Sequence, residues 1–296
     1  MRRVLMALLV TVIVLIAGFA GFLGYVSIID YRPRDVIQIL EDSTQEEIIP
    51  AGRDISITSF NTGYCGLDER ADFFMDGGTM SRAVSREQTN TNIDRISSFL
   101  LGQKSDIYLL QEIDRKSRRS YGTDQYQRFC SDLAGYSSSF ATNYKVAWVP
   151  VPLADPHGNV YSGIATLSRY RVDGAQRYSL PGQYAWPVRL FELDRCMMES
   201  RLPTDDGRQL VLANVHLSAF DKGGFIWAVD ETVPSCRTLD KPYVRGENIE
   251  VNIDGFLVSP GVEVVSVHGH DLGFENSDHN PVTVCIRLGE EASDQD

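Results

Sequence analysis

The chain has 296 residues, of which 43% are hydrophobic and 23% are charged. This composition is typical of a globular protein and excludes a disordered or fibrous chain. Asp and Glu outnumber Lys and Arg by 40 to 28, which gives a formal net charge of -12. Such a charge does not by itself attract a polyanion such as nucleic acid. The five cysteines are scattered without short paired spacings, which argues against a disulfide framework or a zinc site.

The N-terminal segment has the composition of a membrane span. Arg2 and Arg3 precede an uncharged, strongly apolar run over residues 4–29. A helix needs about twenty such residues to cross a bilayer. We therefore expect residues 1–3 to form a cytoplasmic stub and residues 4–29 a transmembrane signal anchor in the cell membrane, with the rest of the chain outside. A cleaved signal peptide and a secreted chain is the alternative, because Gly18-Phe19-Ala20 resembles a cleavage site.

Residues 30–53 are polar and contain Pro33, Pro50 and Gly52, which predicts a linker with one helical turn near residues 35–40. A folded domain is expected over residues 54–289, followed by an acidic tail over residues 290–296. Hydrophobic periodicity predicts helices over residues 85–101 and 124–133. The predicted strands cover residues 55–61, 107–112, 138–144, 163–168, 188–193, 196–202, 209–217, 254–258, 262–267 and 281–288. Many strands with few helices predict an α/β protein built on more than one sheet.

Polar side chains stand at the ends of four predicted strands. Asn61 closes the first, Glu112 the second and His216 a third, whereas Asp278 and His279 open the last. An unpaired carboxylate at the end of a buried strand is costly, so Glu112 predicts a bound cation. Mg²⁺ prefers oxygen ligands and would polarise a phosphoryl oxygen. The two histidines would then transfer protons or bind the phosphate.

Six segments that include these residues occur in a recognisable order. They are Asn61, Gln111-Glu112, residues 163–169 (GIATLSR), Asn214-Val215-His216-Leu217, residues 253–259 (IDGFLVS) and residues 277–281 (SDHNP). Together they resemble the endonuclease/exonuclease/phosphatase family, which includes deoxyribonucleases, apurinic endonucleases, sphingomyelinases and inositol-polyphosphate phosphatases. The resemblance implies an α/β fold, a four-layer sandwich of two packed mixed β-sheets flanked by helices, here preceded by one N-terminal transmembrane helix. It also implies divalent-metal-dependent hydrolysis of a phosphodiester or phosphomonoester, at the outer face of a membrane.

The resemblance also implies a metal site. Glu112 corresponds to the principal ligand of Mg²⁺ or Mn²⁺. Asn61 corresponds to a residue that helps to position metal and phosphate, and Asp278 to an acidic neighbour of the metal.

Three further residues are assigned to proton transfer and phosphate binding by the same resemblance. His216 corresponds to a histidine that contacts the phosphate or acts as an acid. His279 corresponds to one that activates water or binds the scissile phosphate. Asp254 is the expected partner that orients the ring of His279.

One segment of the family pattern is absent. The family normally carries a helix and then a buried strand ending in Gly-Asp-x-Asn between the His-Leu strand and the Ile-Asp-Gly segment, but residues 217–253 contain no Asp-x-Asn. The missing Asp and Asn position the attacking water and stabilise charge on the phosphoryl group. Loss of one preorganised group of this kind commonly costs on the order of a hundredfold in rate. The second hypothesis is therefore a catalytically inactive, membrane-anchored module that binds phosphate or lipid headgroups.

The resemblance implies a phosphoester substrate, and residues 4–29 imply contact with a membrane. The acidic charge and the membrane segment favour lipid headgroups or small phosphoesters, while nucleic acid stays open because basic residues cluster just after Glu112 at positions 115, 116, 118 and 119. This cluster is either a solvated loop or a docking place for phosphate. His157, in a Pro-His-Gly sequence, is expected to be a solvated loop residue. No protein partner can be inferred.

Overall fold

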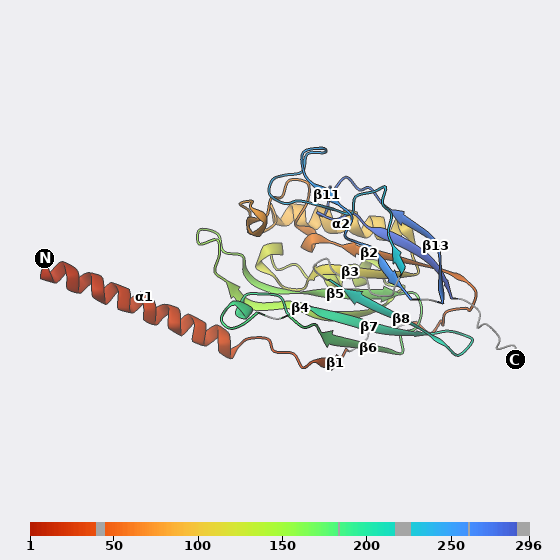
Figure 1. Ribbon diagram of the computed structural model, residues 1–296, viewed down its shortest axis with the longest axis horizontal. Helices are drawn as coiled ribbons and strands as arrows, with labels where there is room; N and C mark the ends of the chain where they lie inside the picture. Colours follow the sequence, from red (N-terminus) through yellow and green to blue (C-terminus); the bar gives the residue numbers. More distant parts are fainter. Residues whose placement is uncertain (40–44, 183, 217–225, 260, 289–296) are drawn as a thin grey trace.

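The computed structural model describes residues 1–39, 45–182, 184–216, 226–259 and 261–288. A long N-terminal helix projects from a domain in which two larger β-sheets face each other (Figure 1). The helices are α1 (Arg2–Ile28), α2 (Arg86–Gln103) and α3 (Gln125–Asp132), and short 3-10 turns are η1 (Gly63–Cys65), η2 (Phe74–Asp76), η3 (Arg118–Ser120) and η4 (Val188–Leu190). The strands are β1 (Val36–Gln38), β2 (Asp54–Asn61), β3 (Ile107–Asp114), β4 (Ser137–Val149), β5 (Gly158–Ser168), β6 (Gly174–Ser179), β7 (Cys196–Pro203), β8 (Gln209–Val215), β9 (Ile226–Ala228), β10 (Cys236–Arg237), β11 (Glu250–Val251), β12 (Phe256–Val258), β13 (Val262–Gly269) and β14 (Val282–Leu288).

The larger sheet has six strands in the order β13-β14-β2-β3-β5-β4. Strands β2 and β3 run parallel, with α2 as the crossover between them, and the other neighbouring pairs are antiparallel. Parallel neighbours end at the same edge of a sheet, and here Asn61 is paired with Gln111. The ends of β2 and β3 therefore bring Asn61 beside Glu112.

The smaller sheet has four strands in the order β1-β6-β7-β8 and is antiparallel throughout. Its inner face packs on the larger sheet through a core that includes Leu202 and Leu212 from the smaller sheet and Ile57, Leu109 and Ile286 from the larger one. Burial of these side chains is the main force that holds the two sheets together.

Helices α2 and α3 cover the opposite face of the larger sheet (Figure 1). Ile93, Ile96 and Leu100 recur at helical spacing on α2 and pack against Leu110 of β3. Leu109 and Leu110 point to opposite faces because successive side chains of a strand alternate. Strand β3 is thus buried on both sides, which matches its nearly continuous apolar sequence.

The predicted fold class is confirmed: the chain is an α/β sandwich of two packed sheets with external helices, preceded by an apolar helix. The predicted strand over residues 188–193 is wrong, because Val188–Leu190 forms the 3-10 turn η4. Phe191 of this segment packs outside the sheets, where its ring stacks on Phe22 of α1. Strand β6 was not predicted.

The segment that we expected to be a linker is attached to the domain. Strand β1 pairs with β6, so the helical turn predicted near residues 35–40 is wrong. Ile49 is fully buried and forms a bridge with Thr204. The described part of residues 30–53 therefore completes the smaller sheet instead of hanging free. The predicted acidic tail lies outside the described residues.

Helix α1 is long and apolar enough to cross a membrane. It has 27 residues, and its most apolar window has a mean hydropathy of 2.8 and is not buried against the domain. Among the described residues it is the one helix with these properties. An anchor and a signal sequence share this composition.

Candidate active site

The ends of β2 and β3 form the first part of the site. Asn61 Nδ2 donates a hydrogen bond to Glu112 Oε1 over 3.2 Å, and Asn61 Oδ1 accepts one from the backbone N–H of Gly63 over 3.0 Å. The pairing of β3 with β5 is irregular between Leu110 and Ile113, and Glu112 has a left-handed backbone with φ 56°. A bulge of this kind redirects a side chain out of the regular pleat. It places the Glu112 carboxylate beside Asn61.

The loop before β14 is tied to the same place. Ser277 Oγ donates to the backbone carbonyl of Asn61 over 2.8 Å. A Cβ atom on Gly63 would lie only 2.6 Å from Asp278 Oδ1, and Gly63 has φ +51°. Glycine is therefore needed at this position both for its backbone conformation and for the close approach of Asp278.

Asp254 and His279 form a buried pair. His279 Nδ1 lies 2.8 Å from Asp254 Oδ2, while His279 Nε2 lies 3.9 Å from Asp278 Oδ2 and 3.6 Å from Cys236 Sγ. Burial alone would lower the pKa of His279, but the carboxylates of Asp254 and Asp278 outweigh it and hold that pKa well above its usual value. The backbone N–H of Asp254 donates to Ser235 Oγ over 2.9 Å, which fixes the acidic partner.

His216 reaches the site from the smaller sheet, just after β8. Two residues earlier, Asn214 joins the two sheets: its Oδ1 accepts from Gln111 Nε2 over 2.9 Å and its Nδ2 donates to the backbone carbonyl of Ala165 over 2.8 Å. His216 Nε2 consequently lies 3.6 Å from Glu112 Oε1. The buried Nδ1 atom of His216 has no hydrogen-bond partner within the part of the chain that the structure describes.

Arg195, just before β7, lies next to this histidine. Its Nη1 donates to the backbone carbonyl of His216 over 3.1 Å, and it forms no ion pair with a described carboxylate. Burial is the main cause that lowers the pKa of His216, and the positive charge of Arg195 acts in the same direction against the opposing effect of Glu112. His216 is therefore a neutral imidazole at neutral pH.

The two carboxylates at the centre of the site differ in acidity. Burial would raise the pKa of Glu112, but the nearby His216, Arg119 and His279 outweigh it and lower that pKa. Burial raises the pKa of Asp278 to about 6, and the charge of Glu112 adds to this effect against the opposing influence of His279. Glu112 is thus ionised at neutral pH, and the negative charges of the two residues lie close enough to act on each other.

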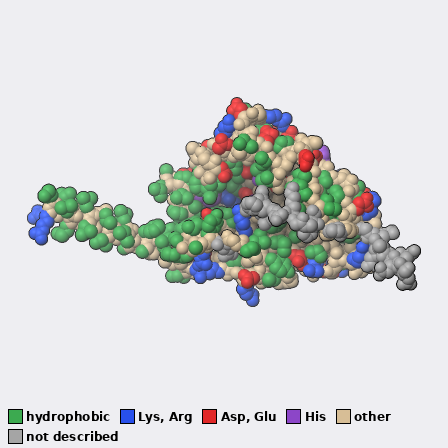
Figure 2. Space-filling model, viewed as in Figure 1, with side chains coloured by type: hydrophobic (Ala, Val, Ile, Leu, Met, Phe, Trp, Pro, Cys, Tyr) green, Lys and Arg blue, Asp and Glu red, His purple; other side chains and the backbone are tan. Residues whose placement is uncertain are grey.

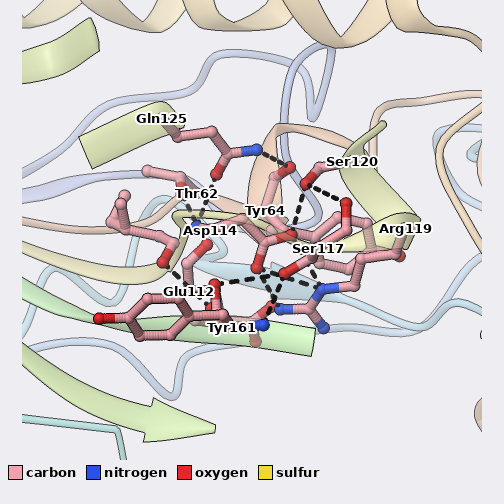
Figure 3. A network of polar contacts seen from close by, with 12 residues as sticks. Thr62, Tyr64, Glu112, Asp114, Ser117, Arg119, Ser120, Gln125 and Tyr161 are labelled. Carbon is pink, nitrogen blue, oxygen red and sulfur yellow. Dashed lines mark hydrogen bonds and ion pairs between the residues drawn. The ribbon is translucent and has the colours of Figure 1, made fainter. Parts of the chain in front are cut away.

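A buried polar network lies next to Glu112 (Figure 3). Arg119 forms an ion pair of 3.0 Å with Asp114, and both side chains are almost completely buried. The Arg119 guanidinium lies 4.0 Å above the ring of Tyr64, and Ser120 Oγ donates to Asp114 over 2.7 Å. Arg119 is therefore not a surface docking residue, although the sequence placed it in a basic cluster. It belongs to the interior and contributes positive charge near Glu112.

A cavity of about 550 Å³ opens beside Asp278 and Cys236. Its lining includes Asp278 and Cys236, which belong to the candidate site, together with Asp76, Lys241 and Glu247. The site therefore adjoins space large enough for a small phosphoester group.

No protein-family model and no curated protein sequence matches the chain. Solved structures do match it. An endonuclease/exonuclease/phosphatase from Beutenbergia cavernae DSM 12333 superposes with a TM-score of 0.54 at 17% identity, covering 80% of this chain and 72% of that one. Family proteins from Leptotrichia buccalis C-1013-b and Bacteroides vulgatus have TM-scores of 0.52 and 0.51 at 10% and 14% identity, covering 79% and 80% of this chain and 99% of each of theirs.

The chain has the endonuclease/exonuclease/phosphatase fold. On this fold the structure brings together all six residues that the sequence singled out, namely Asn61, Glu112, His216, Asp254, Asp278 and His279. Sequence reasoning missed Arg195 and Cys236. Each lies at the first residues of a strand or just before it, but neither belongs to a pattern that distinguishes it from an ordinary strand residue.

The region without the Gly-Asp-x-Asn segment contains only short strands in its described part. Strands β9, β10 and β11 have two or three residues each, and β9 pairs with β12 while β10 pairs with β11. Cys236 of β10 forms a bridge with His279 and so lies beside the ring. Of the acidic residues in this region, Asp221 lies outside the described residues. Asp230 is used in a turn, where it accepts from Thr232 and Gly269.

The donor atoms of this endonuclease/exonuclease/phosphatase fold suit a hard divalent cation. Glu112 and Asp278 offer oxygen ligands, and the mutual effect of their charges would be relieved by a cation between them. Among the described residues no three His, Cys, Asp or Glu side chains form a complete metal site. Mg²⁺ needs only one or two carboxylates, because water and substrate complete its coordination. Asn61 is already engaged, since its amide donates to Glu112.

Proposed function

We propose that this chain is a divalent-metal-dependent phosphohydrolase that cleaves a phosphodiester or phosphomonoester at the outer face of a membrane. One observation carries the proposal: the contacts run without a break from Asp254 through His279 to Asp278, and from Asn61 through Glu112 to His216. Carboxylates, an amide and two histidines in such proximity are the groups that phosphate hydrolysis requires. The fold supports a hydrolase of this class.

The cation would be Mg²⁺ or Mn²⁺, held by Glu112 and Asp278. Asn61 would keep the Glu112 carboxylate in place through the hydrogen bond from its Nδ2, while its Oδ1 stays bound to the Gly63 backbone N–H. When bound, the cation would supply Lewis-acid polarisation of the phosphoryl oxygen and neutralise developing negative charge.

His279 is the group that we assign to the phosphate. Its raised pKa, caused by Asp254 and Asp278 against the effect of burial, makes it an imidazolium at neutral pH. A positively charged ring donates a hydrogen bond to a phosphate oxygen and cannot act as a base. Of the two roles implied by the resemblance, phosphate binding is therefore favoured over activation of water. Asp254 orients the ring and fixes its Nδ1–H.

His216 and Arg195 form the other side of the proposed site. His216 is neutral, because burial lowers its pKa, and so it can contact the phosphate or exchange a proton with a reacting oxygen. Arg195 has donors left after its bond to the His216 carbonyl. We assign it to a phosphate oxygen, since a guanidinium matches the geometry of phosphate.

The place of action follows from α1. We propose that α1 anchors the chain as a single span with the domain on the extracytoplasmic side, and that cleavage of this segment would instead release a secreted domain. The substrate is a phosphoester: a lipid headgroup, a small phosphoester or nucleic acid.

A second candidate function rests on the missing Gly-Asp-x-Asn segment. A catalytically inactive, membrane-anchored module of the same fold would bind phosphate or lipid headgroups without hydrolysing them. The unpartnered Nδ1 atom of His216 in the described structure favours binding of an additional group at this position.

Hydrolysis of bis(p-nitrophenyl) phosphate by the full chain in detergent separates the two candidates. We expect turnover that requires added Mg²⁺ or Mn²⁺ and stops with a chelator. Binding of Mg²⁺ and of inorganic phosphate in calorimetry, without turnover on this or a phosphomonoester substrate, would support the binding module instead. Turnover that persists unchanged with a chelator would contradict the proposed metal dependence.

A further inference from the structure

The C-terminal end of α1 is fastened to the domain. Phe22 stacks on Phe191 with 6.3 Å between ring centroids, and Trp186 Nε1 donates to Ser27 Oγ over 3.1 Å. Just beyond the helix, Arg189 forms an ion pair of 3.4 Å with Asp30. The domain therefore follows α1 directly and does not swing on a free linker.

Exposed apolar side chains gather around this attachment point. We define the junction face as six residues from the end of β4, the β4–β5 loop and the segment that leads into η4: Trp148, Val151, Leu153, Tyr184, Trp186 and Val188. Each is more than a third exposed, and Leu153 is 88% exposed. Figure 2 shows hydrophobic side chains at the end of the domain from which α1 leaves, and Figure 1 shows the β4–β5 loop projecting from the same end. Single exposed apolar residues are ordinary, but a gathered patch indicates an interaction surface.

The two parts of the junction face are held next to each other and next to α1. Tyr144 Oη, on β4, donates to the backbone carbonyl of Phe191 over 2.8 Å. The Lys145 ammonium lies 5.3 Å from the centre of the Tyr31 ring, just beyond α1. The base of the β4–β5 loop is fixed as well, because His157 is buried and its backbone N–H donates to the Val151 carbonyl over 2.9 Å. The base of the loop is therefore fixed to the domain, and its apolar tip is exposed.

The bilayer that would hold α1 is the occupant that fits this face. Once α1 spans the membrane, its C-terminal end lies at the membrane surface, and the contacts of Phe191 and Trp186 with Phe22 and Ser27, in its last two turns, bring the junction face to the same level. Trp and Tyr are the side chains that favour the boundary between hydrocarbon and water. A partner protein would have to displace lipid from beside the helix to reach this face.

The junction face also lies at the same edge of the larger sheet as the candidate site. Ser162 of β5 is paired with Asp114 of β3 on one side and with Tyr144 of β4 on the other, so β3 and β4 run in the same direction. Glu112 lies two residues before Asp114, and Trp148 lies four residues after Tyr144. A bilayer against the junction face is therefore on the side of the domain towards which β3 carries Glu112.

We propose that the junction face docks onto the bilayer that holds α1, with Trp148, Leu153 and Trp186 in its interfacial region, so that the site takes its phosphoester from lipid of the same leaflet. This inference rests on the proposed function for the anchor and for the substrate class. It goes beyond it in naming the surface and the source of the substrate.

Tryptophan fluorescence tests the docking without any need for turnover. The chain contains three tryptophans, Trp148, Trp186 and Trp227. Trp227, on β9, is the matched control, because β9 packs with β14, on the opposite side of the larger sheet from β4 and the junction face. Full-length single-tryptophan variants, made with Trp→Phe at the other two positions, would be reconstituted in phosphatidylcholine vesicles brominated on the acyl chains near the headgroup. We expect strong quenching of Trp148 and Trp186 and little quenching of Trp227.

Extraction with alkaline carbonate separates failure of the docking from failure of the anchor. Retention in the membrane with equal quenching of all three tryptophans, or with none, overturns the docking and leaves the anchor intact. Release by carbonate overturns both.

A second variant tests the same face while all three tryptophans stay in place. Leu153→Asp puts a charge at a fully exposed position, so the fold is retained, but it opposes insertion. We expect it to reduce hydrolysis of vesicle-borne phospholipid by about tenfold, because the free energy of burying one leucine in the membrane is lost. Hydrolysis of soluble bis(p-nitrophenyl) phosphate should be unchanged. Val265→Asp, at an exposed position on β13, is the control and should change neither activity. Equal effects of the two variants on vesicle substrate would contradict the proposal.

Discussion

The two sheets contribute to the candidate site in different ways. The larger sheet and the segment before β14 supply Asn61, Glu112, Asp278 and His279. Asn61 bonds to Glu112, the loop of Asp278 is tied to Asn61 through Ser277, and His279 is held by Asp254, just before β12. The smaller sheet supplies His216 and Arg195, which retain polar atoms without partners in the described structure. The larger sheet therefore fixes the charged groups before a ligand arrives, and the smaller sheet keeps hydrogen-bonding groups available for the ligand.

The largest effect is expected from Glu112, at the centre of the preorganised side. Glu112→Gln retains the shape and the hydrogen bond from Asn61 but removes the charge, and we expect metal-dependent turnover to fall by at least about a hundredfold. Stopped assays with bis(p-nitrophenyl) phosphate as substrate measure this loss of turnover. Glu199→Gln, which breaks the exposed ion pair with Arg201 on β7, is the control and should keep full activity. If both variants are equally active, Glu112 has no central role.

A smaller loss is expected from Asp254, which acts through His279. Asp254→Asn keeps a partner for Nδ1 but removes the charge, and changes of such supporting residues typically cost about tenfold to a hundredfold. Asp254 and Asp278 raise the pKa of His279, so the imidazolium is lost as pH rises through that pKa. Without Asp254 this pKa falls, and the alkaline limb of the pH–kcat profile should move to lower pH. A reduced rate with an unmoved profile would point to a merely structural role for Asp254.

Arg195 tests the ligand-binding side of the comparison. Arg195→Met removes a donor that makes no described ion pair, so the fold should be unaffected. We expect KM for a phosphoester to rise about tenfold, or 1.4 kcal/mol, with kcat nearly unchanged. Arg201→Met provides a matched loss of an arginine on β7 that lies outside the site. A fall in kcat with constant KM would instead place Arg195 in the chemistry.

The smallest effect on activity is expected from His157, which belongs to the larger-sheet side but contributes to stability. Burial lowers the pKa of His157 to about 4, against an ordinary value of 6.5. The unfolded chain therefore binds a proton between pH 6.5 and pH 4 that the folded chain does not bind, and stability falls as pH falls through this range. Between pH 7 and pH 5, His157→Asn should remove on the order of 2 kcal/mol of that pH dependence.

Urea unfolding of the full chain in detergent at pH 7 and pH 5 measures the effect of His157→Asn, with His268→Asn at an exposed position as the control. Turnover at pH 7 should be the same in both variants. An unchanged difference in stability between the two pH values would show that His157 does not stay neutral in the folded chain.

The parts of the fold that were predictable have strong local patterns. Strand β3 is a continuous apolar run and α2 has regular helical spacing, so both were placed within a few residues. The three-residue strand β1 is too short for alternation to appear, and Phe191, just after the Val188–Leu190 turn, packs on Phe22 of α1, which is remote in sequence.

The same distinction holds for the candidate site. Glu112 and the Asp278-His279 pair were identifiable because they stand in ordered motifs. Arg195 and Cys236 were not, because only the approach of β7 and β10 to the site gives them a role. His157 was expected in solvent, whereas the loop folds back and its Nδ1 atom lies within hydrogen-bond distance of the Ser81 carbonyl. Local sequence carries no information on such long-range packing.

The left-handed backbone of Glu112 has a consequence for how this protein can change. Tyr64 and Cys65, in η1 beside β3, also have positive φ angles of 40° and 50°, compared with 56° for Glu112. Each such residue costs about 1 kcal/mol relative to glycine. A glycine at position 112 would relieve that strain and would also abolish the proposed metal ligand. A substitution that increases stability at this position therefore removes activity. Selection for thermal resistance alone would be expected to replace Glu112 before it improved the packing of the core.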